Sequence, residues 1–281
     1  MPKPSSVSTF EAIGTHWWVE SLDGEKPLTD TDLHQLKEAA ETFDALYSRF
    51  KPDSLIGQLN ATGVIDTPPD ELIAMLRFCK EMFEVSHGAF NITVGGALHG
   101  LGYGKRNLSA KVDHSPWEHI IVSEARISIP HDITIDTGGY GKGWLIDALA
   151  DKLRRRGNKH FLINGGGDIY VESDDDVELG LEHPYDAQKI IGSTRLKQGA
   201  LAVSGSAKRT WQHEGREYHH LIDPVTALPV RNQVAGTYVL APTALIADTM
   251  ATILFLRPDL KDELCERYGL QATVLYDDQL S

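Results

Sequence analysis

The spacing of apolar residues predicts helices in the first half of the chain and again near its end. Apolar side chains recur every three or four residues over residues 30–50 and 70–86, which is the period of an amphipathic helix. Pro69 suits the entry position of the second of these helices, because proline lacks the N–H that the first turn leaves unpaired. By the same criteria, further helices are predicted over residues 141–156, 243–256 and 259–268.

Between these segments the pattern changes to short runs that are typical of strands. An aromatic and β-branched run over residues 10–20 predicts an opening strand, and the acidic run ESDDDVE at residues 172–178 predicts a solvated hairpin tip. Helices grouped at both ends of a mostly antiparallel run of strands predict an α+β fold rather than a doubly wound sheet. The remaining strands are predicted over residues 118–123, 126–129, 132–135, 160–164, 168–172, 177–182, 189–195, 200–204, 217–222, 234–240 and 272–276.

Length and charge narrow the class of protein. A chain of 281 residues suits one large domain over residues 1–281, or two fused lobes. The formal net charge of −13 argues against a nucleic-acid partner, which would require clustered Lys and Arg. No apolar run approaches the ~20 residues of a membrane span. The N-terminal segment has no apolar core of a signal peptide, so a cytoplasmic protein is expected. Cys79 and Cys265 lack paired spacing, which predicts neither a disulfide framework nor a cysteine metal site.

A carboxylate stands in the middle of an otherwise apolar helix. The segment ALIADTMATILFL at residues 244–256 predicts a helix buried on all sides, yet it contains Asp248. Thr252 lies one turn further along the same face. The pair offers two hard oxygen ligands suited to Mg²⁺, which prefers oxygen and takes its remaining ligands from water and phosphate. An aspartate paired with a buried arginine, with the threonine bonded to its own backbone, explains the helix equally well.

Two further segments suggest a ligand site, each with a purely structural alternative. In residues 133–153, Asp136 ends a strand, glycines follow, and Lys142 opens a helix whose free N–H groups favour phosphate. This segment matches neither a Walker sequence nor a GxGxxG fingerprint, and a glycine-rich turn alone would explain it. His219 and His220 point to opposite faces of an extended chain, so one of them can serve as a general base for a hydroxyl. A half-buried strand histidine is the alternative.

Two glycine-broken strand ends, at residues 164–168 (NGGGD) and 202–209 (AVSGSAKR), can approach a ligand or form simple turns. Taken together, the segments resemble the ApbE family of FAD:protein FMN transferases, in the family's order and over most of the chain. The resemblance is carried by FEAIGT at 10–15 (FxAMGT), the S-x-aromatic segment ending in SxxxxLN at 48–60, GAFNITVGGAL at 88–98 (GAFDxTVGPL), DTGGYGKGWLID at 136–147 (DLGGxAKGYAVD), residues 164–169 (NxGGDI), residues 218–229 (YHHIIDPxTGxP) and ADTMAT at 247–252 (ADxxAT).

This resemblance implies an α+β architecture related to the T-fold and a defined set of site residues. It implies that Asp248, Thr252 and the main-chain carbonyl of Gly139 hold Mg²⁺ against the FAD diphosphate. It places His220 at the reacting phosphate. The residues that it implies for the FAD site are Ile13, Phe50, Ala89, Phe90, Asn91, Asp136, Lys142 and Ile222.

The implied reaction is attack by a Thr or Ser hydroxyl of an acceptor flavoprotein on the FMN phosphorus of FAD, with AMP leaving. Two alternatives remain open at this point. A hydrolase would use the same site with water as the attacking group, giving FMN and AMP. A flavin-binding protein without activity would be favoured had Asp248, Thr252 or His220 been lost, and all three are present.

The chain departs from the family pattern at three informative positions. Ile13 replaces a methionine, a change of shape in an apolar wall that should be tolerated. Asn91 replaces an aspartate, which removes a charge but keeps an acceptor. Ala227 replaces a glycine, which questions the local turn if that position requires a positive φ. Many relatives are exported, whereas this sequence shows no export signal, so any acceptor protein is expected in the cytoplasm.

Overall fold

The computed structural model describes residues 7–24, 27–104 and 111–280, so part of the segment judged to lack a signal peptide, residues 1–6, lies outside it. Its helices are α1 (Asp30–Tyr47), α2 (Leu55–Thr62), α3 (Asp70–Val85), α4 (Gly95–Gly100), α5 (Pro116–His119), α6 (Gly141–Arg155), α7 (Ala244–Leu256) and α8 (Lys261–Tyr268), with short 3₁₀ turns η1 (Ser206–Lys208), η2 (Pro258–Leu260) and η3 (Asp277–Gln279). Its strands are β1 (Val7–Ala12), β2 (Thr15–Ser21), β3 (Val64–Asp66), β4 (Ile121–Val122), β5 (Arg126–Ser128), β6 (Phe161–Gly165), β7 (Asp168–His183), β8 (Asp186–Ser204), β9 (Thr210–His213), β10 (Arg216–His219), β11 (Ile222–Asp223), β12 (Leu228–Pro229), β13 (Val234–Ala241) and β14 (Gln271–Tyr276).

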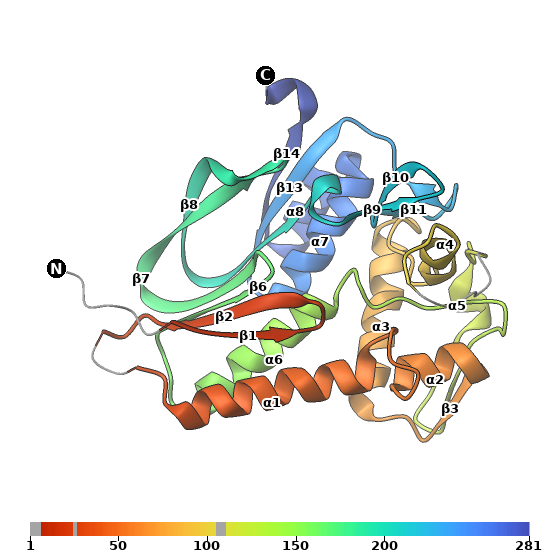
Figure 1. Ribbon diagram of the computed structural model, residues 1–281, viewed down its shortest axis with the longest axis horizontal. Helices are drawn as coiled ribbons and strands as arrows, with labels where there is room; N and C mark the ends of the chain where they lie inside the picture. Colours follow the sequence, from red (N-terminus) through yellow and green to blue (C-terminus); the bar gives the residue numbers. More distant parts are fainter. Residues whose placement is uncertain (1–6, 25–26, 105–110, 281) are drawn as a thin grey trace.

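A seven-stranded sheet in the order β1-β2-β6-β7-β8-β13-β14 organises the molecule, and each neighbouring pair is antiparallel. Helices α6 and α7 pack against the sheet, and α1 packs against α6 (Figure 1). Helices α2 to α5 gather beside the sheet together with the small sheet β3-β5-β4, on the right of Figure 1. The predicted α+β fold with mostly antiparallel strands is therefore confirmed.

One continuous cluster of buried apolar side chains joins the sheet to the helices. It includes Trp17 on β2, Leu149 on α6 and Leu254 on α7, each at most 1% exposed. Burying a side chain of this size contributes roughly 1.5–3 kcal/mol. Helix α7 is buried on nearly all sides, as its composition predicts, and it carries Asp248 into the interior at 3% exposure.

The expectation of a single strand over residues 10–20 is wrong, because the chain turns back in the middle of that run. Ala12 pairs with Thr15, which leaves a two-residue turn at Ile13 and Gly14 between β1 and β2. Both turn residues have a positive φ, 44° at Ile13 and 72° at Gly14, as the turn that matches strand twist requires. The usual signal for such a turn is Asn-Gly. Here isoleucine occupies the first position, so residue type alone does not indicate the turn.

The acidic run at residues 172–178 lies along a strand rather than at a hairpin tip, contrary to expectation. Strand β7 continues through the run and pairs with β8, with an irregularity between Glu172 and Val177. The tip lies at Pro184 and Tyr185. The outer part of this hairpin is largely exposed, so carboxylates along the strand keep their hydration and no turn is needed to expose them. The strands predicted separately over 168–172 and 177–182, and over 189–195 and 200–204, merge accordingly.

Two short strands also differ from the prediction. Residues 132–135 form no regular strand and contribute only an isolated bridge between Thr134 and Val94. In the predicted strand at 118–123, Glu118 and His119 belong to α5, and only Ile121–Val122 forms a strand. Pro116 opens this helical turn, since proline suits the first position of a helix.

The structure shows the state of both cysteines and whether any described helix could span a membrane. Cys79 and Cys265 are both free thiols, and burial raises the pKa of the Cys79 thiol. Among residues 7–24, 27–104 and 111–280, no helix combines the length and apolar character that a membrane span requires.

Ala227 occupies the backbone conformation that its replacement of glycine called into question. Its φ is 56°, and the turn between β11 and β12 forms because its N–H donates to the Asp223 carbonyl at 2.9 Å. Because a Cβ is disfavoured at positive φ, we expect Ala227→Gly to raise the free energy of unfolding by roughly 0.5–1 kcal/mol, measured by chemical denaturation. In the exposed helical position Ala61, the same change should instead lower stability by about 1 kcal/mol. Equal losses in both variants would contradict this account.

Candidate active site

An open cavity of about 1060 Å³ lies where the sheet, the helices α6 and α7 and the loops that follow α1 and α3 meet. Every residue that the sequence assigned to the site lines this cavity. They are Ile13, Phe50, Ala89, Phe90, Asn91, Asp136, Gly139, Lys142, His220, Ile222, Asp248 and Thr252. Segments far apart in the sequence thus converge on one place. What each residue does there stays a prediction.

The loop after α1 and the strand end before α6 are joined by a buried ion pair. The Arg49 Nε donates to Asp136, whose other carboxylate oxygen accepts the Gly138 N–H. Both side chains are buried, at 3% and 8% exposure. The Asp136 carboxylate is therefore already paired and shapes the glycine turn. Sequence reasoning missed Arg49, although it stands between Ser48 and Phe50 in a quoted motif.

The same loop is fixed by two polar residues of that motif. Ser54 caps the start of α2, where its hydroxyl accepts the Gly57 N–H at 2.8 Å and donates to the Ser48 carbonyl at 2.6 Å. Asn60 bonds both the N–H and the carbonyl of Ile135, at 2.8 and 3.0 Å. Because Ile135 precedes Asp136, Asn60 sets the position of the carboxylate without lining the cavity.

Lys142 lies between two carboxylates at the centre of the polar part of the cavity. Its Nζ donates to Asp248 at 2.8 Å and to Asp168, and all three side chains are largely buried. Asp168 comes from the NGGGD segment, where its other oxygen accepts the Val203 N–H at 3.2 Å. The sequence alternative for Asp248, a buried arginine partner, is therefore incorrect, since the partner is a lysine. Thr252 Oγ1 lies 3.3 Å from Ser204 Oγ.

The close approach of α6 and α7 brings these groups together. A Cβ on Gly143 would lie 2.4 Å from the Ala244 carbonyl oxygen, so only glycine permits this contact. Asp147 on α6 accepts the N–H groups of Ala244 and Leu245 at 2.8 and 2.9 Å, which satisfies the start of α7. The Gly143 N–H in turn donates to Asp248 at 2.9 Å. The glycines and the final aspartate of DTGGYGKGWLID thus have a positioning function.

The charges at this centre do not cancel. Burial raises the pKa of Asp248 to about 6, although the Lys142 ammonium opposes the shift and the Asp168 charge adds to it. Burial alone would lower the pKa of Lys142, but the charges of Asp168 and Asp248 raise it to about 12. One ammonium therefore faces two carboxylates. The excess negative charge at neutral pH favours an additional cation.

The donor set fits Mg²⁺ better than a metal that needs a protein cage. Among the described residues, no three His, Cys, Asp or Glu side chains form a group that could hold a metal. The Asp248 carboxylate, the Thr252 hydroxyl and the Gly139 carbonyl are hard oxygen donors on the cavity wall. Mg²⁺ is commonly held by one or two carboxylates together with phosphate oxygens and water. Position 139 also requires glycine, because a Cβ there would lie 2.9 Å from the Phe90 ring.

His220 lines the cavity next to this centre, whereas His219 does not. Strand β10 ends at His219, and His220 follows it. Its Nδ1 lies 3.4 Å from the Arg209 carbonyl, which can only accept, so that contact places the proton on Nδ1 and leaves the Nε2 lone pair free. Burial, aided by the Arg209 charge, lowers the pKa of His220 to about 3. The imidazole is therefore neutral, as a proton acceptor must be.

Another part of the cavity wall is aromatic. The Arg49 guanidinium lies 4.2 Å from the centre of the Phe50 ring and 5.1 Å from that of Tyr103. The two rings approach edge to face with centres 5.9 Å apart, and Phe50 is 57% exposed. A planar aromatic ligand ring can stack against such a surface. Tyr103 lies between glycines in the sequence, and no motif identified it.

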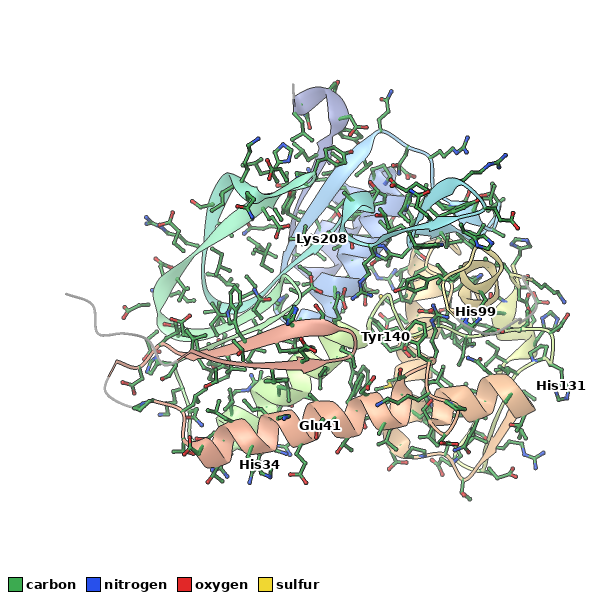
Figure 2. The ribbon with its side chains drawn as sticks, in the orientation of Figure 1. His34, Glu41, His99, His131, Tyr140 and Lys208 are labelled. Atoms are coloured by element: carbon green, nitrogen blue, oxygen red, sulfur yellow. The ribbon has the colours of Figure 1, made fainter. Side chains whose placement is uncertain are left out.

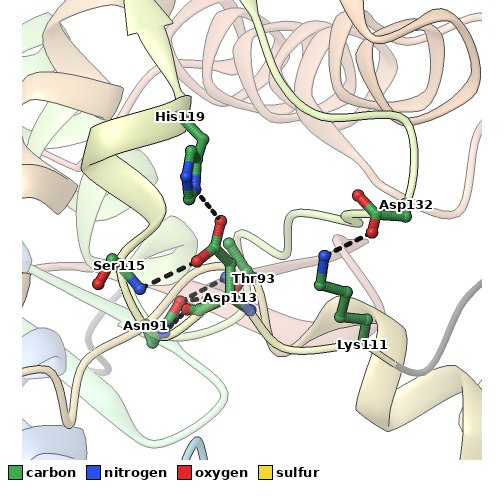
Figure 3. A network of polar contacts seen from close by, with 7 residues as sticks. All are labelled: Asn91, Thr93, Lys111, Asp113, Ser115, His119 and Asp132. Carbon is green, nitrogen blue, oxygen red and sulfur yellow. Dashed lines mark hydrogen bonds and ion pairs between the residues drawn. The ribbon is translucent and has the colours of Figure 1, made fainter.

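Asn91 stands where the family pattern has an aspartate, and its amide has a structural role that this comparison did not reveal (Figure 3). Its amide donates to the Asp113 carbonyl at 2.7 Å, and its Oδ1 accepts from the N–H and hydroxyl of Thr93 at 2.9 and 2.7 Å. Asp113 also pairs with His119 at 2.8 Å. An ionised aspartate could not donate to the Asp113 carbonyl. Asparagine at position 91 therefore removes a negative charge and adds this hydrogen bond.

The model of the ApbE family matches residues 13–274. The chain belongs to the ApbE family. Among its relatives, the FAD:protein FMN transferase of Haemophilus influenzae is 25% identical over 92% of this chain and 83% of its own length. The FAD:protein FMN transferase of Escherichia coli K12 is 24% identical over 96% of this chain and 85% of its own length.

Solved structures of the ApbE family share the fold. The ApbE protein of Thermotoga maritima superimposes with a TM-score of 0.83 at 20% identity, covering 98% of this chain and 95% of that one. The flavin transferase ApbE of Vibrio cholerae gives a TM-score of 0.79 at 20% identity, covering 97% and 94%. The resemblance inferred from the sequence motifs is therefore confirmed for family and for fold.

Proposed function

We propose that this protein transfers FMN from FAD to a Ser or Thr hydroxyl of an acceptor flavoprotein, in a Mg²⁺-dependent reaction that releases AMP. The observation that carries the proposal is the convergence of all twelve predicted site residues on one cavity that has two chemically different ends. The aromatic end at Phe50 and Tyr103 suits a flavin or adenine ring, and the ionic end at Lys142, Asp168 and Asp248 suits a metal-bound diphosphate. Relatives named for this activity support it.

The residues of the ionic end have distinct tasks in this reaction. Asp248, Thr252 and the Gly139 carbonyl would hold Mg²⁺, which neutralises charge that develops on the phosphoryl oxygens. Asp168 holds Lys142 in place through their ion pair. His220 Nε2 accepts the proton of the attacking hydroxyl. The hydroxyl oxygen forms a bond to the FMN phosphorus, and the bond from that phosphorus to the bridging oxygen breaks, its electron pair leaving with AMP.

Bound diphosphate would make His220 a stronger base than it is in the free protein. Burial and the Arg209 cation keep its pKa low when the cavity contains no anion. A nearby negative phosphate favours the imidazolium and therefore raises the pKa toward neutrality. The proton acceptor thus gains basicity only when substrate is present.

Incubation of the protein with FAD and Mg²⁺, with and without a candidate acceptor, tests the function. We expect AMP release that requires Mg²⁺, together with acceptor protein whose mass increases by one covalently bound FMN. AMP and free FMN in equal amounts, with no labelled acceptor, would identify a hydrolase instead. Absence of AMP under all conditions, with FAD bound, would leave only flavin binding.

The ionic end of the cavity also predicts a preference among flavins. We expect FAD to bind at least about tenfold more tightly than FMN, because only FAD presents a diphosphate to the metal and to the cations around it. Calorimetric titration with each flavin in the presence of Mg²⁺ measures this difference. Equal affinities would show that the ionic end does not contact the diphosphate.

A further inference from the structure

Lys142 is poorly placed to neutralise a phosphate on its own. The sequence favoured it as a phosphate-binding group at the start of α6, but its ammonium is already shared by Asp168 and Asp248. The three groups together carry one net negative charge when both carboxylates are ionised. A diphosphate brought into this cavity therefore needs positive charge from elsewhere, in addition to a metal ion.

Two other cations line the same cavity without carboxylate partners. Lys208 is the last residue of η1, and Arg209 follows it. Both belong to the AVSGSAKR segment, which has no role in the reaction as proposed above. Within the described part of the chain, neither side chain has an ion pair or a side-chain hydrogen bond. Arg49 and Lys142 also line the cavity, but each of them has a carboxylate within bonding distance. Unpaired cations on a concave surface attract anions.

Both cations stand next to groups of the reaction centre. Lys208 Nζ lies over the NGGGD turn, 2.9 Å from the place where a Cβ of Gly167 would be, one residue from Asp168. In Figure 2 Lys208 is labelled near the middle of the molecule, above Tyr140, the residue before α6. The Arg209 carbonyl lies 3.4 Å from His220 Nδ1. The Arg209 charge also reaches His220, since it adds to the burial that lowers the pKa of that imidazole.

We propose that Lys208 and Arg209 form an anion-binding cation pair, separate from the metal ligands, that holds the FAD diphosphate against His220 and stabilises the AMP phosphate as it leaves. The assignment to AMP rests on the proposed function; the binding of a diphosphate does not. When the bond to the FMN phosphorus breaks, its electron pair remains on the bridging oxygen, and the AMP phosphate gains negative charge. A guanidinium suits this charge, because it can donate two parallel hydrogen bonds to phosphate oxygens.

The pair is tested by removing each charge and measuring binding without metal. We expect Arg209→Gln and Lys208→Gln each to weaken ADP binding in EDTA by roughly 10- to 100-fold, the worth of a hydrogen bond to a charged group. Riboflavin, which has no phosphate, should bind both variants as it binds the unaltered protein. Arg195→Gln and Lys197→Gln remove the same charges from exposed positions on β8 outside the cavity, and should change neither affinity.

Turnover separates the two parts of the proposal. With FAD, Mg²⁺ and an acceptor protein that carries the target hydroxyl, Arg209→Gln should lower kcat for AMP release, and Arg209→Lys should restore part of it, because the charge returns without the paired donors. Unchanged ADP affinity in Arg209→Gln and Lys208→Gln would overturn the cation pair, as would an equal loss of riboflavin binding. If the unaltered protein releases no AMP yet binds ADP through these residues, the pair stands and the proposed reaction fails. If AMP release is normal in both variants, the reaction stands, and the proposed role of the pair in stabilising the leaving AMP phosphate is overturned.

Discussion

Replacing Asp248 with asparagine is expected to slow AMP release from FAD by at least roughly 10³-fold while leaving a folded protein. The carboxylate is a proposed metal ligand, and losing a metal that stabilises phosphoryl charge costs several kcal/mol of transition-state stabilisation. The fold should survive because asparagine can still accept the Gly143 N–H, and Lys142 keeps Asp168 as its partner. Product analysis across a Mg²⁺ titration, with circular dichroism of the variant, measures both effects.

The same helix supplies a matched pair of controls. Thr252 lines the cavity, whereas Thr249 is fully buried and its hydroxyl has no partner within the described residues. We expect Thr252→Val to raise the Mg²⁺ concentration needed for turnover and Thr249→Val to leave it unchanged. Should Asp248→Asn unfold the protein while the unaltered enzyme proves indifferent to Mg²⁺, Asp248 would be a structural partner of Lys142 only.

His220→Ala is expected to reduce AMP release by roughly 10²- to 10⁴-fold, the usual contribution of a general base. FAD affinity should change little, because the base acts mainly in the transition state. His219→Ala is the internal control, since its side chain does not line the cavity, and it should retain most activity. Single-turnover measurement of AMP isolates the chemical step from product release.

The reverse outcome has a definite meaning. If His219→Ala is the impaired variant, the proton acceptor is the other histidine and the orientation of this segment in solution differs from the structure. If both variants retain activity, the base is not a histidine of this segment. Asp136 is already paired with Arg49, which makes it a weak substitute for either.

Motif residues near one another in sequence were predictable, and their long-range partners were not. The helix at residues 141–156 and its lysine follow from local pattern, but the Asp248 partner of Lys142 lies 106 residues away. Sequence spacing therefore could not show the two carboxylates that pair with Lys142, and a phosphate contact of this lysine stays a prediction. Arg49 was missed for the same reason, because no local sequence pattern indicates that it is buried and paired with Asp136.

Turn chemistry accounts for the main errors of the predicted fold. The β1–β2 turn uses isoleucine where asparagine is usual, so its positive φ could not be inferred from residue type. The acidic run at residues 172–178 predicts a solvated hairpin tip only because charged residues are usually exposed. An exposed strand satisfies that correlation equally well.

Selection for stability and selection for FAD binding should favour different residues at position 13. A non-glycine residue at φ 44° carries a conformational cost of roughly 1–3 kcal/mol, yet this side chain also forms part of the cavity wall and packs against the main core. A library randomised at this position and screened by heat resistance should be enriched in asparagine and glycine. The same library screened by retention of FAD should be depleted of both. Engineering this protein for thermostability should therefore begin at Ala227, where the strain can be removed outside the cavity, and leave Ile13 unchanged.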